Sequence, residues 1–355
     1  MKKSRRIRAK KVGMPPGSLV HVGEVKTEHA ELVLFRYDSA QLTEKSAKNL
    51  SGLDLQPAEN GTLWLNVYGL HDPALIAEIG QKFSLHPLVL EDVMHTNQRP
   101  KLDSYDDYLF IVTRFFSYDK EAMLISSEQV SIVLGRNFVL TFQERPTGSF
   151  DPIRERLRAN KAHIRSAGAG YLSYTLLDVI VDRYFIVLEQ ISDDCETLEE
   201  ELLRKPTSTV LQGIHKLKSE SMELRRAVWP LREVVNSLIR NESGFFDHDT
   251  VLYLRDVYDH TVHFIESLES LRDVLAGMLD IYLSSISNRV NMEVRALTVV
   301  AMLFMPATLI AGIFGMNFKV MPLLQDPDGF WFAMGMMATI AITMGLIFWR
   351  RQWLK

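Results

Sequence analysis

Three residues, Gly315-Met316-Asn317, lie between the two segments of the chain that are apolar enough to span a membrane. Residues 296–318 carry no charged side chain, and neither do residues 329–349. Each segment exceeds the roughly 20 apolar residues that cross a hydrocarbon core. The connecting segment holds Lys319, Asp326 and Asp328 together with two helix-breaking prolines. A polar tripeptide at the mouth of a membrane hairpin is where an ion or a solute would first contact the protein.

Small and weakly polar side chains follow one face of the first apolar segment. Steps of three and four residues along this helical face give Asn291, Val294, Thr298, Ala301, Met305, Thr308 and Gly312. Pro306 leaves the Met302 carbonyl without its helical donor, which a membrane helix tolerates where it lines a cavity. Two interpretations remain open: helix packing, for which small residues and Thr are common, or the lining of a polar path. The second segment is apolar nearly all round and has tryptophans near both ends, which predicts a lipid-facing helix.

Two helices cannot enclose an aqueous path, so a pore requires several copies of the chain in a cyclic homo-oligomer. The connecting segment has one basic residue, Lys319, whereas Arg350, Arg351 and Lys355 follow the second segment. Positive charge marks the cytoplasmic side of a membrane protein. This distribution predicts that both termini are cytoplasmic and that the connecting loop faces outward.

Composition limits the classes of protein to consider. The chain has 355 residues and a net charge of −4, which indicates no nucleic-acid partner. Its single cysteine, Cys195, excludes an internal disulfide and fits a reducing compartment. Residues 1–11 hold seven Lys or Arg but are followed by no apolar signal-peptide region. This basic arm suits either a solubilising tail or contact with anionic lipid.

The residues before the membrane segments divide into an α/β part and a helical part. Short runs rich in β-branched and aromatic residues predict strands at 31–37, 62–68, 108–114, 128–134 and 138–142. A hairpin turn is expected at residues 135–137, and short helices at 73–83 and 88–94. Helices at 171–204 and 207–240 are expected to form an antiparallel pair, and a very long helix at 250–314 to run into the first membrane segment. Motifs of a nucleophile elbow, a phosphate loop or a zinc protease are absent from the sequence, so we expect no enzyme.

Several blocks of the sequence together resemble the CorA-type magnesium and cobalt channels, whose hallmark is the Gly-Met-Asn motif. The end of the first membrane segment, residues 305–318, carries the resemblance most closely. Four further blocks match in order and spacing: residues 86–92, 98–101, 253–260 and 282–288. Phe314 departs from the family pattern, in which tyrosine is more common at that position. The resemblance covers essentially the whole chain.

The resemblance implies an α/β N-terminal cytoplasmic domain, a long-helix stalk and two transmembrane helices, assembled as a funnel-shaped homopentamer in the inner (plasma) membrane. The segments expected are a basic arm at 1–18, the α/β domain at 19–150 and a helical hairpin at 151–248. The stalk helix follows at 249–318, with its transmembrane part at about 295–314. An outer loop at 319–328, the second transmembrane helix at 329–349 and a basic tail at 350–355 complete the chain.

The resemblance also implies the function and the site residues. The expected function is influx of Mg2+, with Co2+ and Ni2+ as further permeants, gated by intracellular Mg2+ bound between subunits. The implied selectivity filter is Gly315, Met316 and Asn317, and the implied pore lining is Asp280, Asn291, Leu297, Met305, Thr308 and Gly312. Regulatory Mg2+ is expected at Glu91, Asp92, Asp178 and Asp256, and a basic collar at Arg350, Arg351 and Lys355.

The chemistry of the ion agrees with these roles. Mg2+ gives up its waters reluctantly, so a ring of neutral Asn317 oxygens can hydrogen-bond the hydration shell without stripping it. One or two carboxylates with waters make a weak site, which suits a sensor of an abundant ion. Two other functions remain open: a zinc-selective, proton-coupled transporter of the same architecture, and a membrane-anchored scaffold or metal-dependent enzyme that transports nothing.

Overall fold

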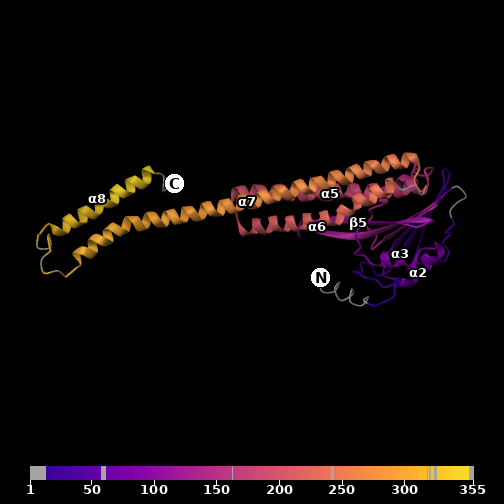
Figure 1. Cartoon of the computed structure of the whole chain (residues 1–355), viewed down its shortest axis with the longest axis horizontal. Coiled ribbons are helices and arrows are strands. Elements are labelled where there is room, and N and C mark those ends of the chain that lie inside the picture. The colour runs from indigo at the N-terminus through magenta and orange to yellow at the C-terminus, as the bar shows by residue number, and fades with distance from the viewer. Residues whose placement is uncertain are drawn as a thin grey trace. The chain divides into compact units, whose positions relative to one another are not determined.

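The computed structural model describes residues 13–56, 61–161, 163–240, 244–317, 319, 321–323 and 326–351. The chain divides into two compact units (Figure 1). The first unit comprises Met1–Leu203 with Ser208–Gly277, and the second comprises Arg204–Thr207 with Met278–Lys355. One continuous helix, α7 (His248–Phe314), contributes residues to both units.

The first unit is built on a seven-stranded sheet with the strand order β2-β1-β3-β7-β6-β5-β4. Neighbouring strands are antiparallel except for the parallel pair β3–β7. The strands are β1 (Glu31–Tyr37), β2 (Leu42–Ala47), β3 (Thr62–Tyr68), β4 (Lys101–Ser104), β5 (Tyr108–Asp119), β6 (Leu124–Gly135) and β7 (Phe138–Gln143). The five predicted strands and the turn between β6 and β7 are confirmed. The two strands that the sequence did not predict, β2 and β4, are the two edges of the sheet.

Helices cover both faces of this sheet. Alternate residues of the strands, such as Leu32 and Leu34, pack with α2 (Pro73–Lys82) and α3 (Pro87–Met94) in one hydrophobic core. The opposite face packs against α4 (Asp151–Arg158) and α5 (Gly168–Arg204). There the ring of Trp64 lies 6.1 Å from that of Phe150, and the ring of Phe116 lies 5.2 Å from that of Tyr184. The central strands are buried on both sides for this reason, and they read as continuous apolar runs.

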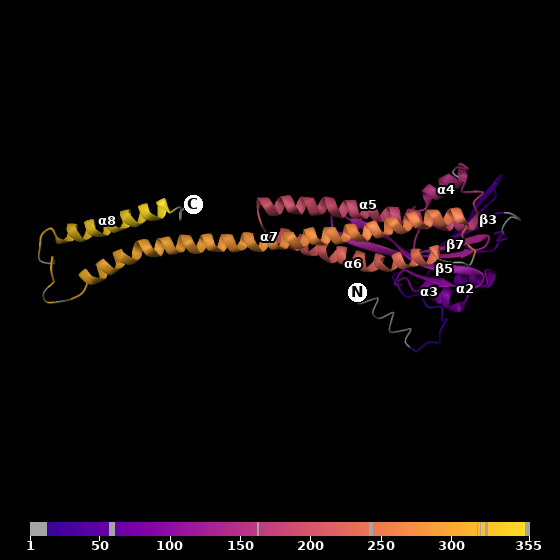
Figure 2. The ribbon, with the colours of Figure 1, turned by 45° about the horizontal axis from the view of Figure 1, so that its top comes forward.

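Three long helices complete the first unit (Figure 2). The predicted pair is confirmed as α5 and α6 (Ser208–Ile239), and the predicted long helix as α7. Tyr184 of α5 contacts Phe264 of α7 at 5.4 Å between ring centroids. Helix α6 packs against the strands β4, β5 and β6.

The second unit contains the membrane-type helices, the C-terminal part of α7 and α8 (Gly329–Arg350). Both are long and apolar enough to cross a bilayer, and only 11% and 6% of their most apolar windows are buried. This low burial distinguishes them from the core helices of a soluble protein. Helix α8 lies alongside α7 in both views (Figures 1 and 2).

Candidate functional site

The Gly-Met-Asn tripeptide ends α7. The Gly315 N–H donates to the Ala311 carbonyl at 2.9 Å, and the Met316 N–H donates to the Ile313 carbonyl at 3.2 Å. A Cβ atom at position 315 would lie 3.1 Å from the Ala311 oxygen, so glycine lets this last turn close tightly. Asn317 follows directly and is exposed. The structure therefore presents the Asn317 side chain just beyond the end of the helix.

The predicted pore-lining residues share one face of α7. At the helical rotation of roughly 100° per residue, they fall within an arc of about 120°. Every member of the set is exposed in the single chain, with Leu297 at 70% and Met305 at 68%. The set is Asp280, Asn291, Leu297, Met305, Thr308 and Gly312.

Helix α8 covers a different face of α7. The buried apolar residues of α7 in the membrane-type segment are Val299 and Ile310, and those of α8 are Ala333 and Phe348. Val299 and Ile310 lie about 150° around α7 from the middle of the predicted lining. The stripe of small and weakly polar residues therefore does not serve packing between the two helices of one chain. The stripe is available for contact with a second copy of the chain or for lining an ion path.

The threonines of this segment keep oxygen atoms available. The Thr308 hydroxyl donates to the Phe304 carbonyl at 2.9 Å, and the Thr298 hydroxyl donates to the Val294 carbonyl at 2.7 Å. Each hydroxyl hydrogen is thus used by the helix backbone, whereas the oxygen lone pairs are left to accept. An oxygen that can only accept suits a cation or the hydrogens of its hydration water.

Asp92 lies on α3 and is held by two side chains. Its carboxylate accepts from the Gln98 amide at 2.5 Å and from the Lys101 ammonium at 2.7 Å. Lys101 also contacts Asp103 at 2.5 Å, so one ammonium bridges two carboxylates. A divalent cation at Asp92 must therefore displace or share the site with Lys101.

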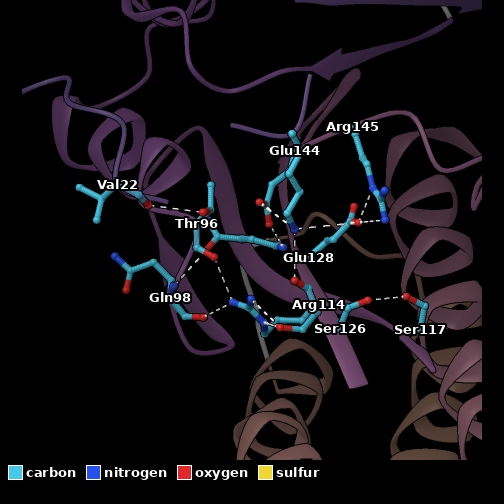
Figure 3. Close-up of polar contacts among 12 residues, drawn as sticks. Val22, Thr96, Gln98, Arg114, Ser117, Ser126, Glu128, Glu144 and Arg145 are labelled. Atoms are coloured by element: carbon cyan, nitrogen blue, oxygen red, sulfur yellow. Dashed lines mark hydrogen bonds and ion pairs between the residues drawn. The ribbon is translucent and has the colours of Figure 1, made fainter. Parts of the chain in front are cut away.

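A buried polar network fixes the loop that carries Gln98 (Figure 3). The Arg114 guanidinium donates to the carbonyls of Thr96, at 3.3 Å, and of Gln98, at 3.0 Å. Burial lowers the pKa of Arg114, and the nearby Glu144 carboxylate opposes that effect. Glu144 in turn pairs with Lys26 at 3.1 Å. The position of the Asp92 carboxylate thus depends on buried residues far along the chain.

Gln129 ties the same loop to α3 directly. Its side-chain amide donates to the Asp92 carbonyl at 3.0 Å, and its side-chain oxygen accepts from the Gln98 N–H at 3.0 Å. Glu91, the residue before Asp92, accepts from the Gly17 N–H at 2.5 Å. The two candidate carboxylates of α3 are therefore anchored by different parts of the fold.

Asp178 and Asp256 lie on α5 and α7, where the structure forms a second acidic cluster. Ligand atoms of Asp178, Asp182 and His260 lie within 4.8 Å of one another. Asp256 is exposed, and its carboxylate lies 3.8 Å from Nε2 of His260. Burial, together with the charge of Asp182, raises the pKa of Asp178 to about 6. A divalent cation would relieve that repulsion, and the two carboxylates and the imidazole could ligate it.

Asp182 and His260 were not among the predicted site residues. Their signal in the sequence is a spacing of four residues from Asp178 and from Asp256, which puts each pair on one helix face. The structure does not bring Asp92 together with Asp256 within one chain. Helix α3 covers one face of the sheet and α5 covers the other, so a cation shared by Asp92 and Asp256 would need a second copy of the chain.

The predicted basic collar is described in part. Arg350 is the last residue of α8, and the N–H of Arg351 caps that helix by donating to the Ile347 carbonyl at 2.9 Å. Both side chains are exposed. Lys355 lies outside the described residues.

Comparisons with known proteins give a consistent result. Residues 59–352 match the family model described as "CorA-like Mg2+ transporter protein". The chain is 43% identical over 351 residues to the cobalt/magnesium transport protein CorA of Thermotoga maritima, covering 99% of each chain. It is 25% identical over 293 residues to the protein of the same name from Methanocaldococcus jannaschii, covering 82% of this chain and 91% of the relative.

The fold comparison agrees with the sequence comparison. The complete structure of the CorA magnesium transporter from Methanocaldococcus jannaschii superposes with a TM-score of 0.79. The alignment covers 92% of this chain and 99% of that one at 22% identity. The expected architecture, an α/β domain with a long helix and two membrane-type helices, is thereby confirmed.

Proposed function

Since the chain belongs to the CorA-like Mg2+ transporter family, we propose that it is a divalent-cation channel that carries Mg2+, and also Co2+, across the inner cell membrane. The observation that carries the proposal is the exposed stripe on α7, which α8 leaves uncovered and beyond whose end Asn317 is exposed. A helix that faces only lipid does not need small and polar residues along one side. In a channel, these residues would line the ion path.

Asn317 is the proposed selectivity residue. A ring of neutral amide oxygens can hydrogen-bond the waters of Mg2+ and release the ion again, whereas a ring of carboxylates would hold it. Gly315 and Met316 shape the turn that presents Asn317. Below it, Leu297 and Met305 form the apolar constrictions, and Asn291, Thr308, Gly312 and Asp280 give the path its polar positions.

The channel is proposed to be a symmetric homopentamer. One chain offers a single lining helix, so several copies are needed to surround a path, and cyclic symmetry closes the ring. The charge at Arg350 and Arg351 supports cytoplasmic termini and an outward Gly-Met-Asn loop. Arg350, Arg351 and Lys355 then form a basic collar at the cytoplasmic end.

Cytoplasmic Mg2+ is proposed to regulate the channel through Glu91, Asp92, Asp178 and Asp256. An ion bound between subunits neutralises facing carboxylates and holds the closed ring. When the ion leaves, the carboxylates repel each other, and the continuous helix α7 links their domain to the lining. Asp182 and His260 belong to the same cluster and are added to the proposed site.

Flux of Mg2+, Co2+ and Zn2+ into liposomes that contain only the purified chain tests this function. A magnesium channel admits Mg2+ and Co2+ down their gradients without a pH gradient. The proton-coupled zinc transporter instead predicts Zn2+ uptake that depends on a pH gradient. An anchored scaffold predicts no flux above that of empty liposomes.

A further inference from the structure

A basic cleft lies in the first unit, between α6 and the loop that carries Gln98. Its volume is about 870 Å³, within the roughly 300–1,000 Å³ that is usual for small-molecule sites. The proposed ion path and cation sites do not include it. The cleft is lined by Gln98, Arg99 and Arg114 on one side and by Arg225, Arg226 and Trp229 of α6 on the other.

The charge of the cleft is positive. Its lining contains four arginines and one carboxylate, that of Glu223. Arg114 is committed to the loop carbonyls. Arg99 and Arg226 are exposed, and within the described part of the chain neither guanidinium forms an ion pair. These two arginines are free to bind an anion.

Only part of the hydrogen-bonding capacity of the Arg225 guanidinium is used. Its Nη2 atom donates to Glu269 at 2.6 Å, whereas its Nε atom is buried and has no hydrogen-bond partner. The contact with Glu269 holds the guanidinium in place. Arg225 also lines the cleft, so a ligand bound there lies beside a preoriented cation.

The cleft is also lined by an aromatic side chain and by a residue whose backbone carbonyl lacks its usual helical donor. The indole of Trp229 is 46% exposed, and the Arg225 guanidinium lies 5.0 Å from its ring centroid. Pro230 has no N–H, so the carbonyl of Arg226 loses its helical donor. Both Arg226 and Pro230 line the cleft. A ligand with a planar ring, a hydrogen-bond donor and an anionic group would match all three features.

We propose that this cleft binds a nucleotide. The phosphates contact Arg99, Arg225 and Arg226, because guanidinium groups bind phosphate oxygens in a forked geometry. The base lies against Trp229, and a hydroxyl of the ribose or an amine of the base donates to the Arg226 carbonyl. The inference does not depend on ion transport. The ligand would contact Gln98, whose side chain holds the carboxylate of Asp92.

The test is calorimetric titration of the full-length protein in detergent, freed of divalent cations, with ATP and with tripolyphosphate. The double variant Arg99→Ala/Arg226→Ala should weaken ATP binding by more than about tenfold, since two charge-assisted contacts are lost. Lys216→Ala removes an exposed charge from α6 outside the cleft and should leave binding unchanged. Trp229→Leu should weaken ATP binding and leave tripolyphosphate binding unchanged.

The proposal is overturned if ATP produces no binding heat, or if the arginine double variant binds ATP as the wild type does. It is also overturned if tripolyphosphate binds as tightly as ATP and Trp229→Leu changes neither, because the cleft is then a site for simple anions. Circular dichroism of each variant establishes that the fold is retained. Arg99→Lys/Arg226→Lys, which keeps the charge, should recover part of the affinity.

Discussion

The Lys101 ammonium lies 2.7 Å from the Asp92 carboxylate, at the position where a regulatory cation would have to bind. An intrachain cation thus already neutralises one of the proposed sensor residues. Divalent binding at Asp92 is consequently an exchange between Lys101 and the ion, and this exchange weakens the apparent affinity. Weak affinity is what a sensor of an abundant ion requires.

Removal of that competitor should tighten regulation. In Lys101→Met, the Mg2+ concentration that half-protects the cytosolic domain from protease should fall several-fold, because the ion no longer displaces an ammonium. Arg36→Met, which removes an ion pair with Asp54 near the opposite edge of the sheet from β4, is the control. An unchanged midpoint in Lys101→Met would show that Lys101 does not compete with the ion, and a higher midpoint would show that Lys101 supports the site.

A tethered cation at Asp256 should imitate the bound ion. In the wild type, Mg2+ should protect the cytosolic domain from proteolysis, and chelation should abolish the protection. In the proposed assembly, the ammonium of Asp256→Lys would face the carboxylates of a neighbouring copy, so protection should persist under chelation. Equal cleavage of the wild type with and without Mg2+ would discard the sensor and leave these acids as surface residues.

The ionised carboxylate of Asp178 should lower the stability of the metal-free protein and contribute to binding of the ion. Its pKa is raised to about 6, so ionising it in the folded protein costs stability as the pH rises from its ordinary value of 3.8 through about 6. Asp178→Asn should therefore stabilise the metal-free protein at pH 7.5 by about 1 kcal/mol, since partial exposure screens the repulsion. The gain should vanish near pH 4, where the wild-type carboxyl is protonated.

The same variant should respond less to Mg2+. Thermal unfolding with and without Mg2+ measures both effects, and Asp178→Asn should show a higher melting temperature without the ion and a smaller increase with it. A variant that is less stable than the wild type at pH 7.5 would contradict the electrostatic account of this cluster.

Met305 should act as an apolar constriction. Met305→Ser places a hydroxyl on the stripe, which eases wetting and should raise Mg2+ leak through the closed channel in high internal Mg2+. Val300→Ser is the matched control, because Val300 is 51% exposed on α7 but lies outside the stripe. Equal leak from the two variants would count against a gate at position 305.

The sequence predicted the central strands and the long helices because burial leaves a clear apolar pattern in them. The edge strands β2 and β4 escaped prediction. Residues 42–47 are largely exposed and polar, as edge strands often are, and such a run resembles a loop. Pairing with a neighbouring strand, rather than the residues themselves, makes these segments strands.

Some features of the candidate site could likewise be predicted from the sequence, and others could not. Helical spacing placed a stripe of small and weakly polar residues on one face of α7, the family resemblance implied which residues line a pore, and the structure leaves that face uncovered. The pairing of Lys101 with Asp92 could not be predicted, since it depends on β4 lying beside α3 in the folded domain. The role of each residue in ion binding remains a prediction that concerns several copies of the chain.

Mg2+ entry into liposomes that contain either the wild type or Asn317→Ala tests the central claim most directly. Asn317 is exposed beyond the end of α7, so the substitution should leave folding and assembly intact, which size-exclusion chromatography checks. We predict that wild-type liposomes take up Mg2+ and that Asn317→Ala abolishes uptake, because the ring of partners for the hydrated ion is lost. Equal Mg2+ entry through both proteins would contradict the account.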